Sequence, residues 1–280
     1  MGWGDDLIFL GEAEKIHKET GKKIYPVYGK QEGVMFENVD FITTKLDDNS
    51  ISINARDVDK SLGLSEIHID YYVKKKIKTS KGERLIWNDD YKPKVYKMPF
   101  SKEEEWAAER FNRWITKDIS KSIIVNPDAK HTFFNKNKMW GFDKWQELTT
   151  RLSKDYQIVR IMPGSEYKHP FLQDAYNIKS PNLRRSLCFM SKAMMGVTFN
   201  GLLEHLWGGY DVPCIRICGD FISSKHMGYP TTHSVALDES PCGATYECEH
   251  CKKANKKITV DMVYEACIET LNNINRRLKD

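Results

Sequence analysis

A chain of 280 residues, 40% of them hydrophobic and 11% aromatic, is globular and long enough for one large core or two ordinary ones, and its length favours two. Its 43 basic and 39 acidic residues are interspersed and leave a net charge of only +4. That charge is too weak and too dispersed for a nucleic-acid-binding surface, so we expect no nucleic-acid partner.

The first 119 residues predict a helix followed by short strands. Apolar residues recur with helical spacing over 5–17 and end before Gly21, and a strand follows at 23–29. From 32 to 99, short strand-like pieces alternate with polar turns. Ser101 and Glu104 form a capping box, which predicts a helix over 101–119 that ends this half.

Strands and helices alternate regularly in the second half, which predicts an α/β fold. The expected strands are 122–127, 156–162, 195–199 and 213–219, and the expected helices are 142–155, 181–193, a short helix after Gly201, and a final helix behind a Thr259 cap.

The turn between the third and fourth of these strands places Gly201 at the start of a helix. At the carboxyl end of a parallel strand, a helix N-terminus offers N–H groups and partial positive charge to an anion. A glycine there also fits a tight turn alone, and His205 nearby also fits a hydrogen-bonded core histidine. The turn by itself therefore leaves both interpretations open.

A resemblance to a known family rests on four segments that follow one another in the order found in that family: 2–13, 126–148, 198–213 and the tail from 241. Together they resemble glycosyltransferase family 9, which includes the ADP-heptose:lipopolysaccharide heptosyltransferases. The resemblance covers the first fifteen residues and most of 120–280. It implies a GT-B type α/β fold, with two Rossmann-like domains facing a cleft. We expect a shortened N-terminal acceptor-side domain at 1–119 and a nucleotide-sugar-binding domain at 120–280.

The resemblance implies a general base near the N-terminus. Gly4-Asp5 matches a Gly-Asp pair whose aspartate takes the proton from the acceptor hydroxyl, and Asp6 is a second candidate. Asp5 also fits a helix N-cap, and the two roles are compatible.

The resemblance also implies a donor site. Lys138, just before a tryptophan position of the family, is expected to contact the diphosphate, together with the turn Asn200-Gly201-Leu202. His205 is expected near the nucleotide or in support of that turn. Heptosyltransferases usually carry Asp-Thr-Gly at the turn, and this chain lacks that acid, which puts heptose as the donor sugar in doubt.

Two groups of residues are metal-binding candidates. Asp57 and Asp59 form an acidic pair that a chain this rich in acids makes by chance. In the tail, Cys242, Cys248, His250 and Cys251 offer three thiolates and one imidazole, which suits tetrahedral zinc. A single CxxC without a second pair also fits reduced, packed thiols.

Other features of the sequence indicate the cellular compartment. No apolar run approaches the ~20 residues of a membrane span, and acids stand where a signal peptide has basic residues. Four of seven cysteines lie in apolar contexts typical of reduced core thiols: Cys188, Cys214, Cys218 and Cys267. Lysine runs at 73–78 and 251–257 suit solvated faces or anionic headgroups. We expect a cytoplasmic protein, with at most peripheral contact with the inner membrane.

The sequence therefore predicts an inverting, metal-independent glycosyltransferase with a candidate structural zinc. It would move a sugar from a nucleotide-diphosphate sugar, such as an ADP-heptose-like donor, to a glycan or lipid-linked hydroxyl in lipopolysaccharide or surface-glycan biosynthesis. The alternative is a non-catalytic nucleotide-sugar or glycan-binding protein of the same fold. A zinc-containing nucleic-acid-binding protein is a third interpretation, which the small net charge disfavours.

Overall fold

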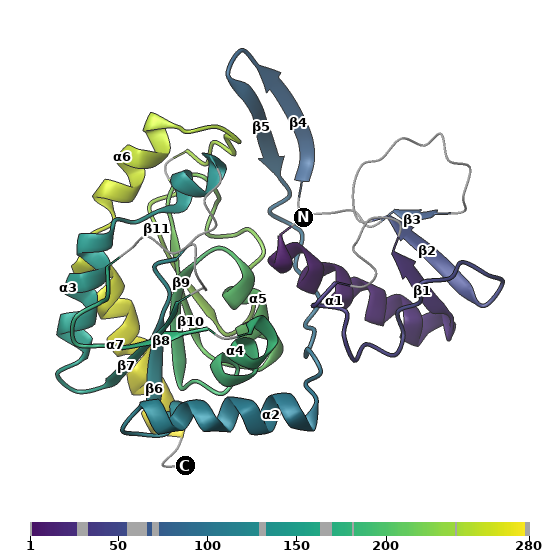
Figure 1. The fold of residues 1–280 in the computed structure, drawn as a ribbon. Helices are drawn as coiled ribbons and strands as arrows, with labels where there is room; N and C mark the ends of the chain where they lie inside the picture. Colours follow the sequence, from purple (N-terminus) through teal and green to yellow (C-terminus); the bar gives the residue numbers. More distant parts are fainter. Residues whose placement is uncertain are drawn as a thin grey trace.

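The computed structural model describes residues 2–26, 33–54, 66–68, 73–128, 133–162, 170–180, 182–238 and 240–277. Asp57 and Asp59 lie outside these residues. The described chain contains a six-stranded sheet with helices on both faces, a separate three-stranded sheet and a projecting two-stranded hairpin (Figure 1). Among the described residues, no helix is long and apolar enough to cross a membrane.

The C-terminal half is built on a parallel sheet of order β11-β10-β9-β6-β7-β8. Its strands are β6 (Ser122–Val125), β7 (Gln157–Met162), β8 (Tyr176–Lys179), β9 (Met195–Phe199), β10 (Cys214–Cys218) and β11 (Thr232–Ala236). The chain runs outward from β6 to β8, returns to β9 beside β6, and then runs outward on the other side. This is Rossmann topology, and its strand order reverses between β6 and β9.

Helices cover both faces of this sheet (Figure 1). One face carries α3 (Phe142–Leu152) and α7 (Val260–Arg277), which pack against each other, and α6 (Glu249–Lys257) continues that side. The other face carries α4 (Leu183–Met190) and α5 (Leu202–Gly209). A Cβ at Gly196 would lie 2.2 Å from the Trp207 ring, so this strand glycine lets α5 pack directly onto β9.

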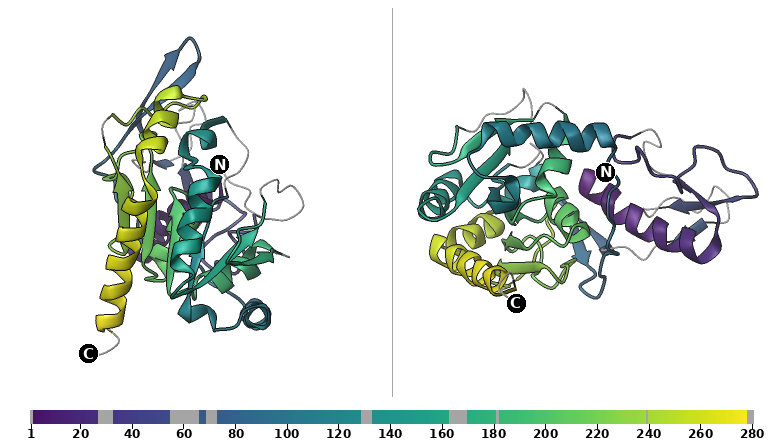
Figure 2. Two further views of the ribbon diagram at one scale, coloured as in Figure 1. Left: turned by 90° about the vertical axis from the view of Figure 1, so that its left-hand side faces the viewer. Right: turned by 90° about the horizontal axis from the view of Figure 1, so that it is seen from below.

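The N-terminal half begins with α1 (Trp3–Thr20), whose buried residues 7–13 face α5 on one side and the small sheet on the other. That sheet is parallel, of order β1-β2-β3, with β1 (Lys23–Pro26), β2 (Ser50–Asn54) and β3 (Glu66–His68). The view from below shows α1 between the two sheets (Figure 2). The hairpin β4 (Val73–Thr79) and β5 (Gly82–Trp87) follows.

The expected helix over 101–119 is wrong in extent. The capping box of Ser101 and Glu104 is present, but α2 covers only Lys102–Glu109 and is followed by the 3-10 turns η2 (Arg110–Trp114) and η3 (Ile119–Lys121). Between these turns, the Gln157 side chain accepts hydrogen bonds from the backbone N–H groups of Thr116 and Lys117, at 3.0 and 2.7 Å. A tertiary contact therefore satisfies groups that a continuous helix would use itself.

Arg184 of α4 joins the two halves. Its guanidinium is buried, forms an ion pair with Glu104 of α2, and donates to the backbone oxygens of Val34 at 3.0 Å and Pro99 at 2.6 Å. A buried guanidinium with several acceptors is costly to disrupt, so this contact holds the N-terminal segment on the C-terminal half.

Candidate donor-binding site

The candidate site lies where the strand order reverses. β6 and β9 are neighbours, and the chain leaves β6 towards α3 on one face of the sheet and β9 towards α5 on the other (Figure 1). In open α/β sheets, ligands bind beyond the carboxyl ends of the strands at such a point. Asn126 follows β6 and donates from its side chain to Thr198 at 3.0 Å, which ties the two strand ends together. Asn200 and Gly201 follow β9, and α5 begins at Leu202. The turn singled out from sequence therefore occupies the usual ligand position of this fold.

Lys138 faces this turn from the end of η4 (Phe133–Lys138). Its Nζ donates to the backbone oxygen and to the side-chain oxygen of Asn200, both at 3.3 Å, and lies 5.3 Å from the centre of the Phe221 ring. Burial lowers the pKa of Lys138 from its ordinary value, while the negative charges of Asp5 and Glu204 oppose that shift. The structure thus brings Lys138 and Asn200 together, and their contact with a diphosphate stays a prediction.

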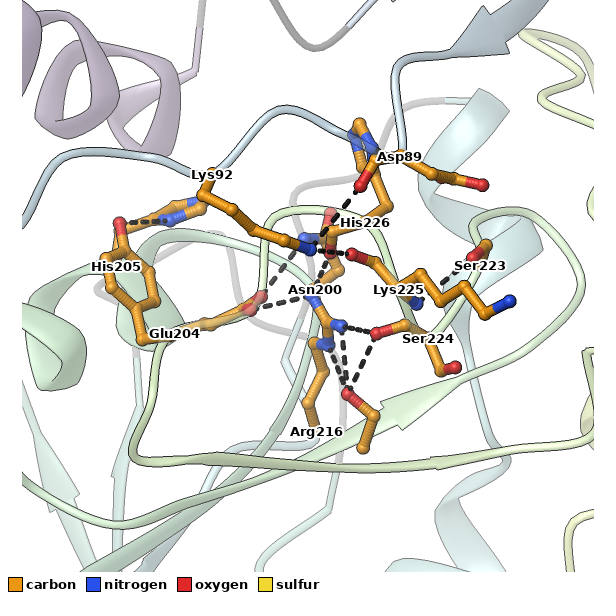
Figure 3. A network of polar contacts seen from close by, with 12 residues as sticks. Asp89, Lys92, Asn200, Glu204, His205, Arg216, Ser223, Ser224, Lys225 and His226 are labelled. Atoms are coloured by element: carbon orange, nitrogen blue, oxygen red, sulfur yellow. Dashed lines mark hydrogen bonds and ion pairs between the residues drawn. The ribbon is translucent and has the colours of Figure 1, made fainter.

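A buried charge network supports the turn (Figure 3). The Asn200 amide NH₂ donates to Glu204 at 3.0 Å, and Arg216 donates to the other Glu204 oxygen at 2.7 Å. The side chains of Glu204 and Arg216 are both fully buried. Arg216 also donates to the backbone oxygens of Ser224 and His226, each at 2.7 Å. Because the amide NH₂ is engaged by Glu204, the amide oxygen of Asn200 is turned towards Lys138.

Burial raises the pKa of Glu204, and the charge of Arg216 opposes that shift. Neither residue was assigned a role from sequence. The available signal was Arg216 itself, a charged residue in the middle of the apolar strand Cys214–Cys218, because a buried charge requires a partner. The identity of that partner depends on the tertiary fold.

The first turn of α1 packs against the first turn of α5. A Cβ at Gly4 would lie 3.1 Å from Cδ2 of His205 and 3.2 Å from the backbone nitrogen of Leu202. Asp5 is in this turn, and its carboxylate accepts from the backbone N–H of Gly2 at 2.8 Å. The helix N-cap is Gly2, so Asp5 is the third helical residue and not the cap. Asp6 follows it in the same turn, partly buried.

Asp5 is electrostatically close to the donor turn, since its charge raises the pKa values of both Lys138 and His205 against the larger effect of burial. The candidate base and the candidate diphosphate-binding lysine are therefore near enough to interact electrostatically, although they are far apart in the sequence. The roles of Asp5 and Asp6 in proton transfer stay predictions.

His205 is buried between α1 and the chain after β10. Its Nδ1 pairs with the Tyr229 hydroxyl at 3.0 Å, and burial lowers its pKa to about 3, so the ring is neutral at ordinary pH. These contacts fit one of the two roles expected for His205, which is to support the turn Asn200-Gly201-Leu202.

Gly201 is extended, with φ of 170°, and among the described residues a Cβ there would meet only Phe199, at 3.8 Å. The described part of the chain therefore leaves room for a ligand over the Gly201 backbone. The sequence pattern predicts that a phosphate approaches the backbone at this point.

A second group of side chains gathers beyond β10. The ligand atoms of Cys242, Cys248, His250 and Cys251 all lie within 4.8 Å of one another, so this cluster could hold a metal ion. The sulfur of Cys242 lies 3.2 Å from that of Cys251 and 3.9 Å from that of Cys248. A hydrogen bond with Cys251 lowers the pKa of Cys242 to about 5, which favours its thiolate. The structure thus assembles the four residues that the sequence pattern indicated.

The sequence matches no protein-family model, and no curated protein matches it significantly. In structure, the chain is similar to the crystal structure of the glycosyl transferase family 9 from Veillonella parvula DSM 2008, with a TM-score of 0.59, 11% identity, and coverage of 98% of this chain and 94% of that one. The chain has the fold of a family 9 glycosyltransferase. This agreement confirms the GT-B type fold expected from the resemblance.

Further similarities are partial. E. coli ADP-heptose lps heptosyltransferase II is 17% identical with a TM-score of 0.47, over 70% of this chain and 56% of that one. The dodecameric iron-containing heptosyltransferase TibC, in complex with ADP-D-beta-D-heptose, is 16% identical with a TM-score of 0.42, over 56% of this chain and 46% of that one. The chain therefore spans about half the length of these two heptosyltransferases.

Proposed function

We propose that the protein is an inverting glycosyltransferase that uses a nucleotide-diphosphate sugar. The observation that carries the proposal is the meeting of three features at the reversal of strand order: the Lys138 ammonium, the open backbone at Gly201 before α5, and the Asp5 carboxylate in the facing turn of α1. A cation and a helix N-terminus suit a diphosphate, and the carboxylate suits a general base.

The chemistry assigns a role to each group. The acceptor hydroxyl attacks the anomeric carbon while its proton passes to Asp5, with Asp6 as the second candidate. The bond from the anomeric carbon to the diphosphate oxygen breaks, and its electron pair leaves on the nucleotide diphosphate. Lys138 and the first N–H groups of α5 stabilise that negative charge. A single displacement inverts the anomeric configuration, and Lys138 supplies the charge that a metal supplies elsewhere.

The same proposal covers the partners. The donor is held by Lys138, Asn200, Gly201 and Leu202 of the domain 120–280, and the acceptor side is formed by 1–119. The amide of Asn200 stands where heptosyltransferases usually have an acidic residue, which counts against heptose itself, so the proposed donor is a sugar nucleotide that resembles ADP-heptose. The acceptor is a glycan or a lipid-linked hydroxyl, reached from the cytoplasm, with at most peripheral contact with the membrane.

A thermal-shift panel with ADP, GDP, UDP and CDP, and with their sugars, tests donor binding, because a ligand that binds only the folded state raises its Tm. We expect one diphosphate to raise the Tm of the wild type and to have little effect on Lys138→Ala. Lys136→Ala is the matched control: Lys136 lies in the same 3-10 turn but is exposed and paired with Glu247 at 3.0 Å. Equal losses in both variants, or no shift in the wild type, would contradict the proposed site.

Transfer is tested with Asp5→Asn, which keeps an oxygen for the Gly2 N–H and loses the base. We expect this variant to retain the diphosphate-induced shift and to release at least 100-fold less diphosphate from the nucleotide sugar in the presence of mixed glycan acceptors. The N-terminal sheet of only three described strands favours one alternative, nucleotide-sugar binding without transfer. A wild type that binds the donor and releases no diphosphate would support that alternative.

A further inference from the structure

The cysteine cluster has the internal order of a metal site. Cys248 is the N-cap of α6, and His250 and Cys251 follow in its first turn, while Cys242 approaches from the preceding loop. The Nδ1 atom of His250 is buried and makes no hydrogen bond among the described residues. Its Nε2 atom lies 3.4 Å from the carboxylate of Asp220, which is itself buried. A metal-bound histidine usually binds the ion through one ring nitrogen and contacts a carboxylate through the other. In His250, one nitrogen is near the Asp220 carboxylate and the other is on the side of the thiols.

We propose that Cys242, Cys248, His250 and Cys251 bind one zinc ion in a closed tetrahedral site. Three thiolates and one imidazole nitrogen complete the coordination, and Asp220 orients His250 from outside. Four protein ligands leave no position for substrate, so the ion is structural and takes no part in transfer.

The loop 242–251, which contains the four proposed zinc ligands, also binds the side chain of Asn137. The Asn137 side chain is fully buried, donates to the backbone oxygens of Ala244 at 2.9 Å and Tyr246 at 2.7 Å, and accepts from the backbone N–H of Cys248 at 2.9 Å. The next residue is Lys138. Zinc therefore positions the lysine of the donor site through the loop 242–251 and Asn137, a step that rests on the proposed function.

The same loop forms hydrogen bonds with the hairpin β4–β5 of the N-terminal half. The backbone N–H of Leu85 donates to Gly243 at 2.8 Å, and Glu83 and Thr245 exchange hydrogen bonds at 2.9 and 3.1 Å. Gly243 has φ of 57°, and a Cβ there would lie 2.0 Å from the Leu85 oxygen, so strand β5 fits closely against this loop. Loss of the ion would thus loosen two attachments, that of Lys138 and that of the hairpin.

Metal analysis of the purified full chain tests the site directly. We expect one zinc per chain, with release of the ion to a chromophoric chelator when the thiols are blocked with a mercurial. His250→Ala removes a ligand at a half-exposed position and is the variant best able to fold, with Cys242→Ser beside it. Cys267→Ser is the control for thiol loss, because Cys267 is buried in α7 away from the cluster.

We expect both ligand variants to lose zinc and to have a lower Tm than the control. A chelator should lower the Tm of the wild type and of Cys267→Ser, and should leave the Tm of the two ligand variants unchanged. Stoichiometric iron in place of zinc would overturn the choice of ion. Absence of metal from wild type grown with zinc, or a Cys242–Cys251 disulfide in its place, would overturn the site.

The link to the donor site has its own measurement. In the zinc-free but folded His250→Ala variant, we expect the diphosphate that stabilises the wild type to bind about 10-fold more weakly, while Cys267→Ser binds as the wild type does. Unchanged affinity would overturn the link. If no diphosphate binds even the wild type, the proposed function fails, and the zinc content still decides the metal site by itself.

Discussion

Lys138 lies 3.3 Å from two oxygens of Asn200, one of the backbone and one of the side chain. Glu204 holds the amide NH₂ of the same asparagine, and Arg216 neutralises Glu204, so the orientation of the amide is determined by a buried network. Lys138 is thereby held at the start of α5. For the proposed reaction, such preorganisation is what charge stabilisation in a transition state requires.

Replacement of Gly201 by alanine should separate binding from folding. Of the residues that the structure describes, the new methyl group would meet only Phe199, at 3.8 Å, so the free energy of unfolding should change by less than about 1 kcal/mol. The methyl group would occupy the space over the backbone where a phosphate is expected, and diphosphate affinity should fall about 10-fold. Calorimetric titration and urea unfolding measure the two effects. Gly196→Ala is the contrast, since its methyl group would overlap Trp207 and lower stability. Unchanged affinity in Gly201→Ala would place the phosphate elsewhere.

Glu204→Gln should destabilise the protein strongly. It leaves the buried guanidinium of Arg216 without its counter-charge, and breaking a buried ion pair by removing one partner costs about 3–5 kcal/mol. Glu19→Gln is the control, because its pair with Lys15 is exposed at 3.8 Å and should contribute less than about 1 kcal/mol. Urea unfolding at neutral pH compares them. Equal stabilities of the two variants would show that the Glu204–Arg216 pair contributes little.

Acid should destabilise the protein through His205. Burial lowers its pKa from 6.5 to about 3, so the unfolded chain binds a proton that the folded chain does not. The stabilisation from the neutral ring is complete above pH 6.5 and is lost as the pH falls towards 3, by at most about 1.4 kcal/mol per pH unit.

The measurement is urea unfolding of wild type and His205→Gln between pH 7 and pH 4. The variant should have the shallower dependence on pH, by up to one proton. His226 is the internal comparison, because burial lowers its pKa to about 3 as well and that contribution remains in the variant. Parallel curves for the two proteins would show that His205 is accessible to protons in the folded state.

The alternating elements of the C-terminal half were predictable because their patterns are local. Apolar periodicity and caps located β6, β7, β9, β10, α3 and α7. The lysine-rich segment 251–257, for which the sequence indicates a solvated or headgroup-facing run, forms most of α6, which buries only Cys251, Ala254 and Asn255. An element with so little apolar surface gives a weak sequence signal. In the N-terminal half, the strands are short and their pairing depends on partners distant in sequence.

The sequence by itself determined the Rossmann-like alternation, the turn at Asn200 and Gly201, and the four metal-binding candidates, because spacing along the chain encodes helices, strands and a CxxC pair. Tertiary structure alone decided that Lys138 meets Asn200, that Glu204 pairs with Arg216, that Asp220 faces His250, and that Asn137 joins the cysteine loop to Lys138. These contacts join residues from different strands and loops. Their geometry comes from the packing of these separate elements against one another, because a buried polar group pairs with whatever the completed fold places beside it.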